Sequence, residues 1–139
     1  MLSVALSLLW AASHPPADIR PILRTQGFPA PLDREHSTIN LIGNIKQGSR
    51  IYSVYFYEGW FGQAHRGINR ILVILDRRTF LGDYATTAAR DCRIHGQAVV
   101  CKTDYPGNRI QFTKNGPPRE IWLDGEILTF TTAEWLRRN

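Results

Sequence analysis

One short segment holds most of the side chains that could contact a partner. Six aromatic residues lie between positions 52 and 61, and Trp60 and Phe61 stand between two glycines. Tryptophan, tyrosine and arginine are enriched where proteins bind their partners. We therefore predict a contact loop at 59–67, and its candidate binding residues are Tyr55, Tyr57, Trp60, Phe61, His65 and Arg66.

A strand leads into this predicted loop, and its side chains should alternate between two faces. Tyr52 and Phe56 fall on one face while Tyr55 and Tyr57 fall on the other, so one face can enter a core and the other can present tyrosines. The alternative is that Trp60 and Phe61 fold back and plug the open end of the domain. Changing Trp60 to Ala distinguishes the two alternatives. If Trp60 is a plug, the variant should lose stability, and if it is a contact residue, the variant should lose partner capture.

No residue pattern predicts catalysis, a metal site or a cofactor. None of the serines lies in Gly-x-Ser-x-Gly, and no two of the four histidines are spaced to ligate a metal from one element. Asp76 ends a predicted strand, Asp83 follows Gly82, and Asp124 occupies the hairpin turn, so each has a local structural role that explains its residue type. An enzyme is therefore not expected, unless carboxylates or His65 meet only in three dimensions.

The positive charge does not indicate nucleic-acid binding. Lys and Arg total 17 against 12 acidic residues, a formal charge of +5, but the arginines are scattered along the chain. The only adjacent pairs are Arg77-Arg78 and Arg137-Arg138, neither of which belongs to a basic run of the kind that contacts nucleic acid. We do not expect a nucleic-acid partner.

The two cysteines are spaced for a disulfide across one hairpin. A type II′ turn at Gly96-Gln97 makes Cys92 and Cys101 an opposed, non-hydrogen-bonded pair, whose α-carbon separation suits a disulfide. Such a short loop implies a contribution of about 2–3 kcal/mol. Redox chemistry would need Cys-x-x-Cys, and a structural zinc needs more ligands. The disulfide predicts an oxidising compartment.

The first residues also point to export. Residues 2–12 are almost wholly apolar and end in the small residues Ala11-Ala12-Ser13, so we predict a signal peptide at 1–13 with cleavage after Ser13. The apolar run is well short of the ~20 residues of a permanent membrane span. Because no Lys or Arg precedes this run, a buried N-terminal helix or strand is the alternative. The predicted location is periplasmic or secreted.

The remaining sequence predicts an all-β fold in one domain. Five prolines lie between positions 14 and 37, which predicts an extended leader with at most a helical turn at 19–24. From residue 38 short β-rich runs alternate with turns, and Asp124-Gly125 is the strongest hairpin signal. A last helical turn is expected at 132–138. We predict an antiparallel meander forming a small sandwich or partly open barrel with strands at 38–45, 50–58, 69–76, 79–86, 91–95, 98–103, 108–113, 119–123 and 126–131.

These expectations favour a non-catalytic binding module for a protein or a cell-envelope component. A small secreted hydrolase and a structural or assembly subunit that pairs through exposed strand edges are the alternatives. Three observations discriminate among them. A cleft with two converging ionisable groups would indicate the hydrolase, an exposed aromatic patch the binding module, and a long bare edge strand the assembly subunit.

Overall fold

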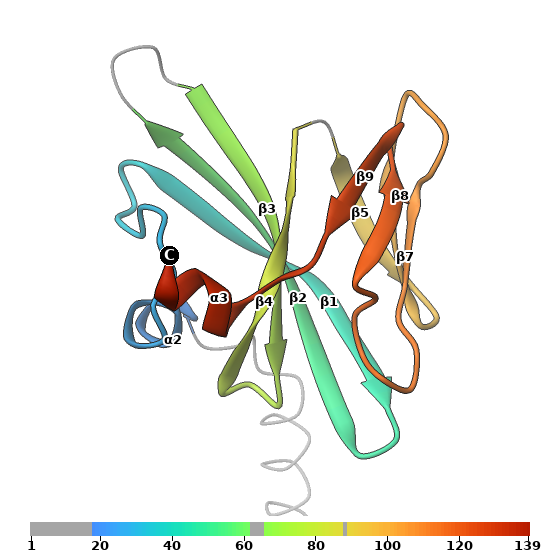
Figure 1. Ribbon diagram of the computed structural model, residues 1–139, viewed down its shortest axis with the longest axis horizontal. Coiled ribbons are helices and arrows are strands. Elements are labelled where there is room, and N and C mark those ends of the chain that lie inside the picture. The colour runs from blue at the N-terminus through green and yellow to red at the C-terminus, as the bar shows by residue number, and fades with distance from the viewer. Residues whose placement is uncertain (1–17, 62–65, 88) are drawn as a thin grey trace, which may run out of the picture.

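Ten strands and two short helices make up the described part of the chain, which is residues 18–61, 66–87 and 89–139 of a computed structural model. The fold is an all-β sandwich, as the sequence predicts (Figure 1). The elements are α2 (Arg20–Thr25), β1 (Ser37–Gln47), β2 (Arg50–Phe61), β3 (Arg66–Leu75), β4 (Thr79–Thr86), β5 (Arg90–His95), β6 (Ala98–Lys102), β7 (Arg109–Gln111), β8 (Glu120–Leu123), β9 (Glu126–Thr129), β10 (Thr131–Thr132) and α3 (Ala133–Arg138).

The larger layer is a five-stranded antiparallel sheet in the order β1-β2-β3-β4-β10. Its first four strands follow one another as hairpins, which confirms the predicted meander. The exception is β10, a two-residue strand near the C-terminus that pairs Thr131 with Asp83 of β4. A strand this short leaves no periodicity in the sequence, so it is set by the tertiary fold.

The smaller layer consists of the sheets β5-β6-β7 and β8-β9. An isolated antiparallel bridge between Asn108 and Leu123 joins β7 to β8, so the five strands follow one another across the layer. The β8-β9 hairpin turns at Asp124 and Gly125, which have φ of 49° and 75°. Both values are positive, as the predicted type I′ turn requires.

The predicted disulfide hairpin is confirmed. His95 pairs with Ala98 and Ile94 with Val99, and Gly96 at the turn has φ of 61°. A disulfide joins Cys92 to Cys101. The register shifts just beyond it, where Asp91 has φ of 49°, so the ladder resumes only at Arg90 and Lys102.

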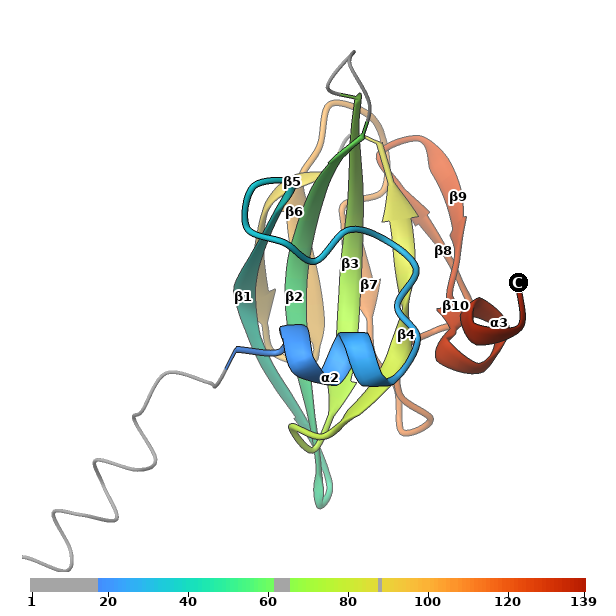
Figure 2. The same cartoon turned by 90° about the vertical axis from the view of Figure 1, so that its left-hand side faces the viewer.

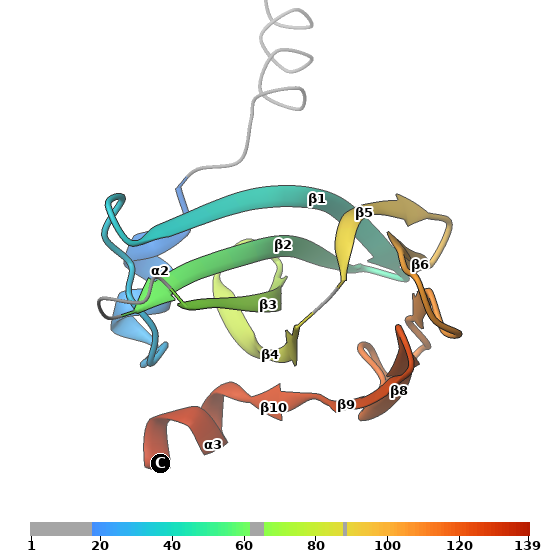
Figure 3. The same cartoon turned by 90° about the horizontal axis from the view of Figure 1, so that it is seen from above.

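Two hydrophobic cores lie on the two faces of the large sheet. The first is packed between this sheet and β5–β9 and includes Tyr52, Val73, Ile110 and Leu123. The second lies on the opposite face, where α2 and α3 are found (Figures 1 and 3). The large sheet is therefore a central layer with a hydrophobic core on each face.

The proline-rich segment contributes to the second core. Figure 2 shows α2 and the chain that follows it crossing the face of the large sheet. The helix starts with a proline in its first turn, where the missing N–H is tolerated, and its Leu23 is buried together with Phe28. Sequence analysis places the start of the domain at residue 38, whereas these packed residues come earlier. The predicted signal peptide, residues 1–13, lies outside the described residues.

Candidate functional site

The predicted contact loop is shorter than expected. Trp60 and Phe61 belong to β2 and pair with Gly67 and Arg66 of β3. The loop prediction is therefore wrong for these residues. Gly59 suggested a strand end, but it lies within the strand, where an added Cβ would collide with the ring of Tyr57. The glycine thus makes room for a packed aromatic ring. Predicted His65 and the side chains of Phe61 and Arg66 lie outside the described residues.

Tyr55 and Tyr57 are brought together in the second core and are both buried. The Tyr57 hydroxyl donates to the carbonyl of Pro31 at 2.6 Å, and its ring meets Phe28 edge-on at 5.1 Å between centroids. Burial raises the pKa of Tyr57 to about 12. The expectation that this face presents tyrosines is wrong, because the N-terminal segment covers it. Trp60 is half-buried, and its backbone N–H donates to His36.

A buried ion pair lies in the same region. Arg70 of β3 contacts Asp83 of β4 at 3.0 Å, and the two side chains are 17% and 1% exposed. Arg70 also lies over the ring of Phe28, 5.7 Å from its centroid. Burial raises the pKa of Asp83 although Arg70 opposes the shift. Because both groups lie beneath the N-terminal segment, we interpret the pair as structural.

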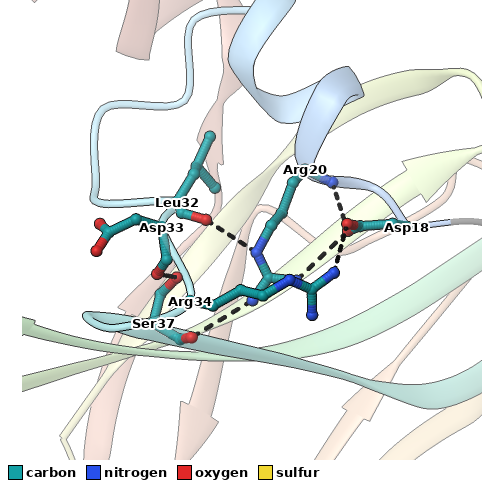
Figure 4. Close-up of polar contacts among 6 residues, drawn as sticks. All are labelled: Asp18, Arg20, Leu32, Asp33, Arg34 and Ser37. Carbon is teal, nitrogen blue, oxygen red and sulfur yellow. Dashed lines mark hydrogen bonds and ion pairs between the residues drawn. The ribbon is translucent and has the colours of Figure 1, made fainter.

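One exposed group of ligand-type side chains lies in the loop before β1. Asp33, Glu35 and His36 place their polar atoms within 4.8 Å of one another. A hydrogen bond between Asp33 and His36 lowers the pKa of the carboxyl and raises that of the imidazole. The same loop is held by Arg20, whose guanidinium donates to the carbonyls of Leu32 and Ser37 (Figure 4). These contacts hold the loop in place, so we interpret Asp33, Glu35 and His36 as structural residues of the loop.

The outer face of the small layer carries an exposed apolar pair that includes one aromatic residue. Trp122 and Ile127 are cross-strand partners on β8 and β9, with exposed fractions of 52% and 63%. The neighbouring strands continue the row, because Arg93 pairs with Val100 and Val100 with Arg109. The Asn108–Leu123 bridge is antiparallel, so Arg109 and Trp122 are next to each other across it. We call this row the outer row: Arg93, Val100, Arg109, Trp122 and Ile127.

The loop between β6 and β7 fixes the end of the hairpin that carries Trp122. The carboxylate of Asp124 is buried and accepts hydrogen bonds of 2.9 Å from the backbone N–H groups of Asp104 and Tyr105. The backbone of the turn bonds back, from Asp124 to the carbonyl of Gly107 at 2.6 Å. Gly107 has φ of 89°, and a Cβ there would collide with Trp122. These hydrogen bonds thus fix the backbone that carries Trp122 and the exposed Tyr105.

A polar groove of about 620 Å³ lies across β5 and β6 beside the outer row. Its lining includes a carboxylate, an ammonium group, a hydroxyl and an amide, from Asp91, Lys102, Thr103 and Asn108. Cys101 also lines it, so the disulfide ties together the two strands that form it. Among the residues that the structure describes, none forms an ion pair with Arg93, Lys102 or Arg109.

Two other surface features lie apart from the outer row. A hollow of about 560 Å³ between β9 and α3 is lined by Phe130 and Trp135 and by one charged residue, Arg119. β1 is an edge strand of 11 residues, the feature that an assembly subunit would use. A register shift at Gly43 and a hydrogen bond from Gln97 to the carbonyl of Lys46 interrupt that edge. Such interruptions discourage edge-to-edge pairing.

Sequence analysis missed the outer row because it treated Trp122 only as part of a predicted strand. The alternation does place Trp122 on the side opposite Ile121 and Leu123. Both sides of this strand carry apolar residues, so the alternation alone does not tell which side is exposed. The distinction depends on which face the large sheet covers.

Comparisons with protein-family models, with curated proteins and with solved structures found no match. The site is therefore assigned on geometry and chemistry. None of the described helices is long and apolar enough to cross a bilayer. The disulfide is compatible with a periplasmic or extracellular protein.

Proposed function

We propose that this protein is an exported, non-catalytic binding module that engages a cell-envelope component through the outer face of β5–β9. One observation carries the proposal: the exposed Trp122 lies next to Arg109, which forms no ion pair with a described acid, in a row that reaches the polar groove of β5 and β6. Tryptophan and arginine are the residue types that dominate binding energy when a partner buries them. The proposed contact site therefore lies on the small layer, β5–β9, and not at the predicted 59–67 segment of the large sheet.

Export is supported by two independent features. The disulfide needs an oxidising compartment to persist, and the apolar N-terminal run ends in small residues typical of signal cleavage. N-terminal sequencing of protein recovered from the envelope or medium tests this part. We expect the mature chain to begin at His14, and protein that still begins at Met1 would contradict export.

A binding role is favoured over hydrolysis by where the ionisable groups lie. The converging pair, Arg70 and Asp83, is buried in the second core, and the Asp33–His36 pair is committed to its own exposed loop. A hydrolytic site needs such groups within reach of a bound substrate. The groove at β5–β6 also holds charged side chains, among them Asp91 and Lys102, and the row that borders it carries the exposed Trp122, a combination suited to holding a ligand.

Affinity capture from an envelope fraction tests the proposal. The oxidised mature protein is immobilised as wild type, as Trp122→Ala and as Trp135→Ala. Trp135 in α3 has an exposed fraction of 57%, similar to the 52% of Trp122. It is therefore a matched control for the loss of a surface indole. We expect Trp122→Ala to lose most of the captured material and Trp135→Ala to keep it. Equal capture by all three proteins would contradict the assignment of the binding face.

A further inference from the structure

We infer that the outer face binds an anionic polysaccharide, with Trp122 stacking on a sugar ring and arginines of the outer row binding its carboxylates. The inference rests on the proposed function and adds the chemical class of the ligand. Three features of the face support it: the exposed indole of Trp122, the donors and acceptors of the groove, and the cations of the outer row.

The shape of the face suits an extended chain. The outer row crosses five adjacent strands, so its side chains lie side by side in a line rather than around a closed pocket. Neighbouring strands are about 4.8 Å apart, and the row is therefore long enough to contact several consecutive sugar units. Trp122 stands within this line, where its ring can cover the C–H face of one unit.

The groove supplies the groups that a hydroxyl-rich ligand needs. Asp91 accepts hydrogen bonds, Lys102 donates them, and Thr103 and Asn108 do both. A sugar hydroxyl is likewise both donor and acceptor, so it can pair with each of these side chains. The disulfide next to Asp91 holds β5 against β6 and keeps the donors and acceptors in place.

The charges favour a ligand that carries carboxylates. Arg93 and Arg109 flank Val100 in the outer row, and Lys102 follows on β6. Guanidinium groups bind carboxylates through two parallel hydrogen bonds. Two acids, Asp91 and Glu120, lie on the same face, so the positive surplus is small. We therefore expect binding that weakens with salt but depends also on the indole.

The face is a poorer match to a protein partner. Stable protein interfaces have an apolar core from which charged residues are depleted. Here the apolar residues Trp122 and Ile127 have charged neighbours on β7 and β8, namely Arg109 and Glu120. Proteins also bind single-stranded nucleic acid through aromatic stacking and cationic side chains. The carboxylates on this face would repel the closely spaced phosphates of such a strand. The experiment includes it as a competing probe.

Isothermal titration of the oxidised mature protein with polygalacturonate tests the inference, with dextran as the neutral polymer and an oligodeoxythymidine as the nucleic-acid probe. We expect polygalacturonate to bind and dextran to bind about tenfold more weakly or not at all. Trp122→Ala should weaken binding by about tenfold or more. Arg109→Gln should weaken it by roughly tenfold and reduce its dependence on salt.

Two matched variants serve as controls, Trp135→Ala for the indole and Arg119→Gln for the charge, since both lie at the hollow by α3. Their affinities should equal that of the wild type, and all variants should melt as folded proteins. Three results would overturn the inference: no binding of polygalacturonate, equal binding of dextran, or tighter binding of the oligodeoxythymidine. If envelope capture still depends on Trp122 in those cases, the ligand class is wrong and the proposed function stands.

Discussion

The aromatic residues of β2 and those of the β8-β9 hairpin have opposite environments although both belong to hydrophobic strands. β2 crosses the middle of the large sheet, and its tyrosines are buried on both faces, Tyr52 in the first core and Tyr57 in the second. Among the described residues, only one face of the layer that contains β8 is covered, so Ile121 is buried while Trp122 is exposed. The density of aromatic residues therefore marks the core, whereas the candidate surface is marked by an exposed indole next to Arg109 and the polar groove.

The covering of the large sheet explains this difference. On one face lie β5–β9, and on the other lie the N-terminal segment and α3, which contact each other where Arg137 meets Gly27. The outer face of β5–β9 has no such cover among the described residues. Mutations in the two regions should thus affect different properties, stability in β2 and β3 and binding in β8.

The largest expected contrast is between Tyr57→Ala and Trp122→Ala. Tyr57 is fully buried and its hydroxyl is hydrogen-bonded, so truncation should lower the free energy of unfolding by about 3–5 kcal/mol. Trp122 is half-exposed, and its truncation should cost less than about 1 kcal/mol. Urea denaturation of both variants measures the contrast. Similar losses for the two would mean that the regions do not differ.

The next largest effect concerns the buried ion pair. Arg70→Met leaves the carboxylate of Asp83 buried without its partner and should cost about 3 kcal/mol. The double variant Arg70→Met/Asp83→Leu removes both charges and should recover most of this loss in stability. Neither charge then has to lose its hydration when the protein folds. Urea denaturation at pH 7 tests both variants. A single variant as stable as the wild type would show that water reaches the pair.

A smaller, local effect is expected from the disulfide. Reducing the Cys92–Cys101 disulfide should lower the free energy of unfolding by about 2–3 kcal/mol, a modest loss because the disulfide closes a short loop. Hydrogen exchange should show faster exchange in β5 and β6, with β2 and β3 little changed. Ligand capture should fall as the groove loosens. Uniformly faster exchange across both layers would contradict a local role.

The smallest predicted effect is a pH dependence of stability. The pKa of Asp83 is raised above its ordinary value of 3.8 by burial, so the folded state holds its proton to higher pH than the unfolded state does. The stabilising contribution of this group is complete below pH 3.8 and is lost as pH rises through the raised pKa. Urea denaturation between pH 3.5 and pH 7 should therefore show the wild type losing stability relative to Arg70→Met/Asp83→Leu. A constant difference would contradict the raised pKa.

Much of the fold follows from local chemistry that the sequence displays. Asp124-Gly125 and Gly96-Gln97 demand particular turns, and these turns set the pairing that brings Cys92 to Cys101. The first four strands of the large sheet were also predictable as β-rich runs between turn residues, although β2 continues through Trp60 and Phe61, and the two-residue β10 was not predictable.

The site was not predictable to the same degree, because exposure depends on contacts between distant segments. Tyr57 is buried by Phe28 and Pro31, which precede it by more than twenty residues in a segment predicted as a leader. Trp122 is exposed because nothing described covers its side of the hairpin. A single sequence shows the alternation of each strand but not which side is covered.

Trp122 is thus expected to serve binding, while the aromatic residues of β2 serve the fold. Trp60→Ala and Trp122→Ala should be measured together, by thermal unfolding and by capture from the envelope fraction. We predict that Trp60→Ala melts earlier and, below its melting temperature, captures normally, whereas Trp122→Ala melts with the wild type and captures little. Normal melting and lost capture in Trp60→Ala, with full capture by Trp122→Ala, would instead place the binding site at the 59–67 segment and exclude the outer face of β5–β9.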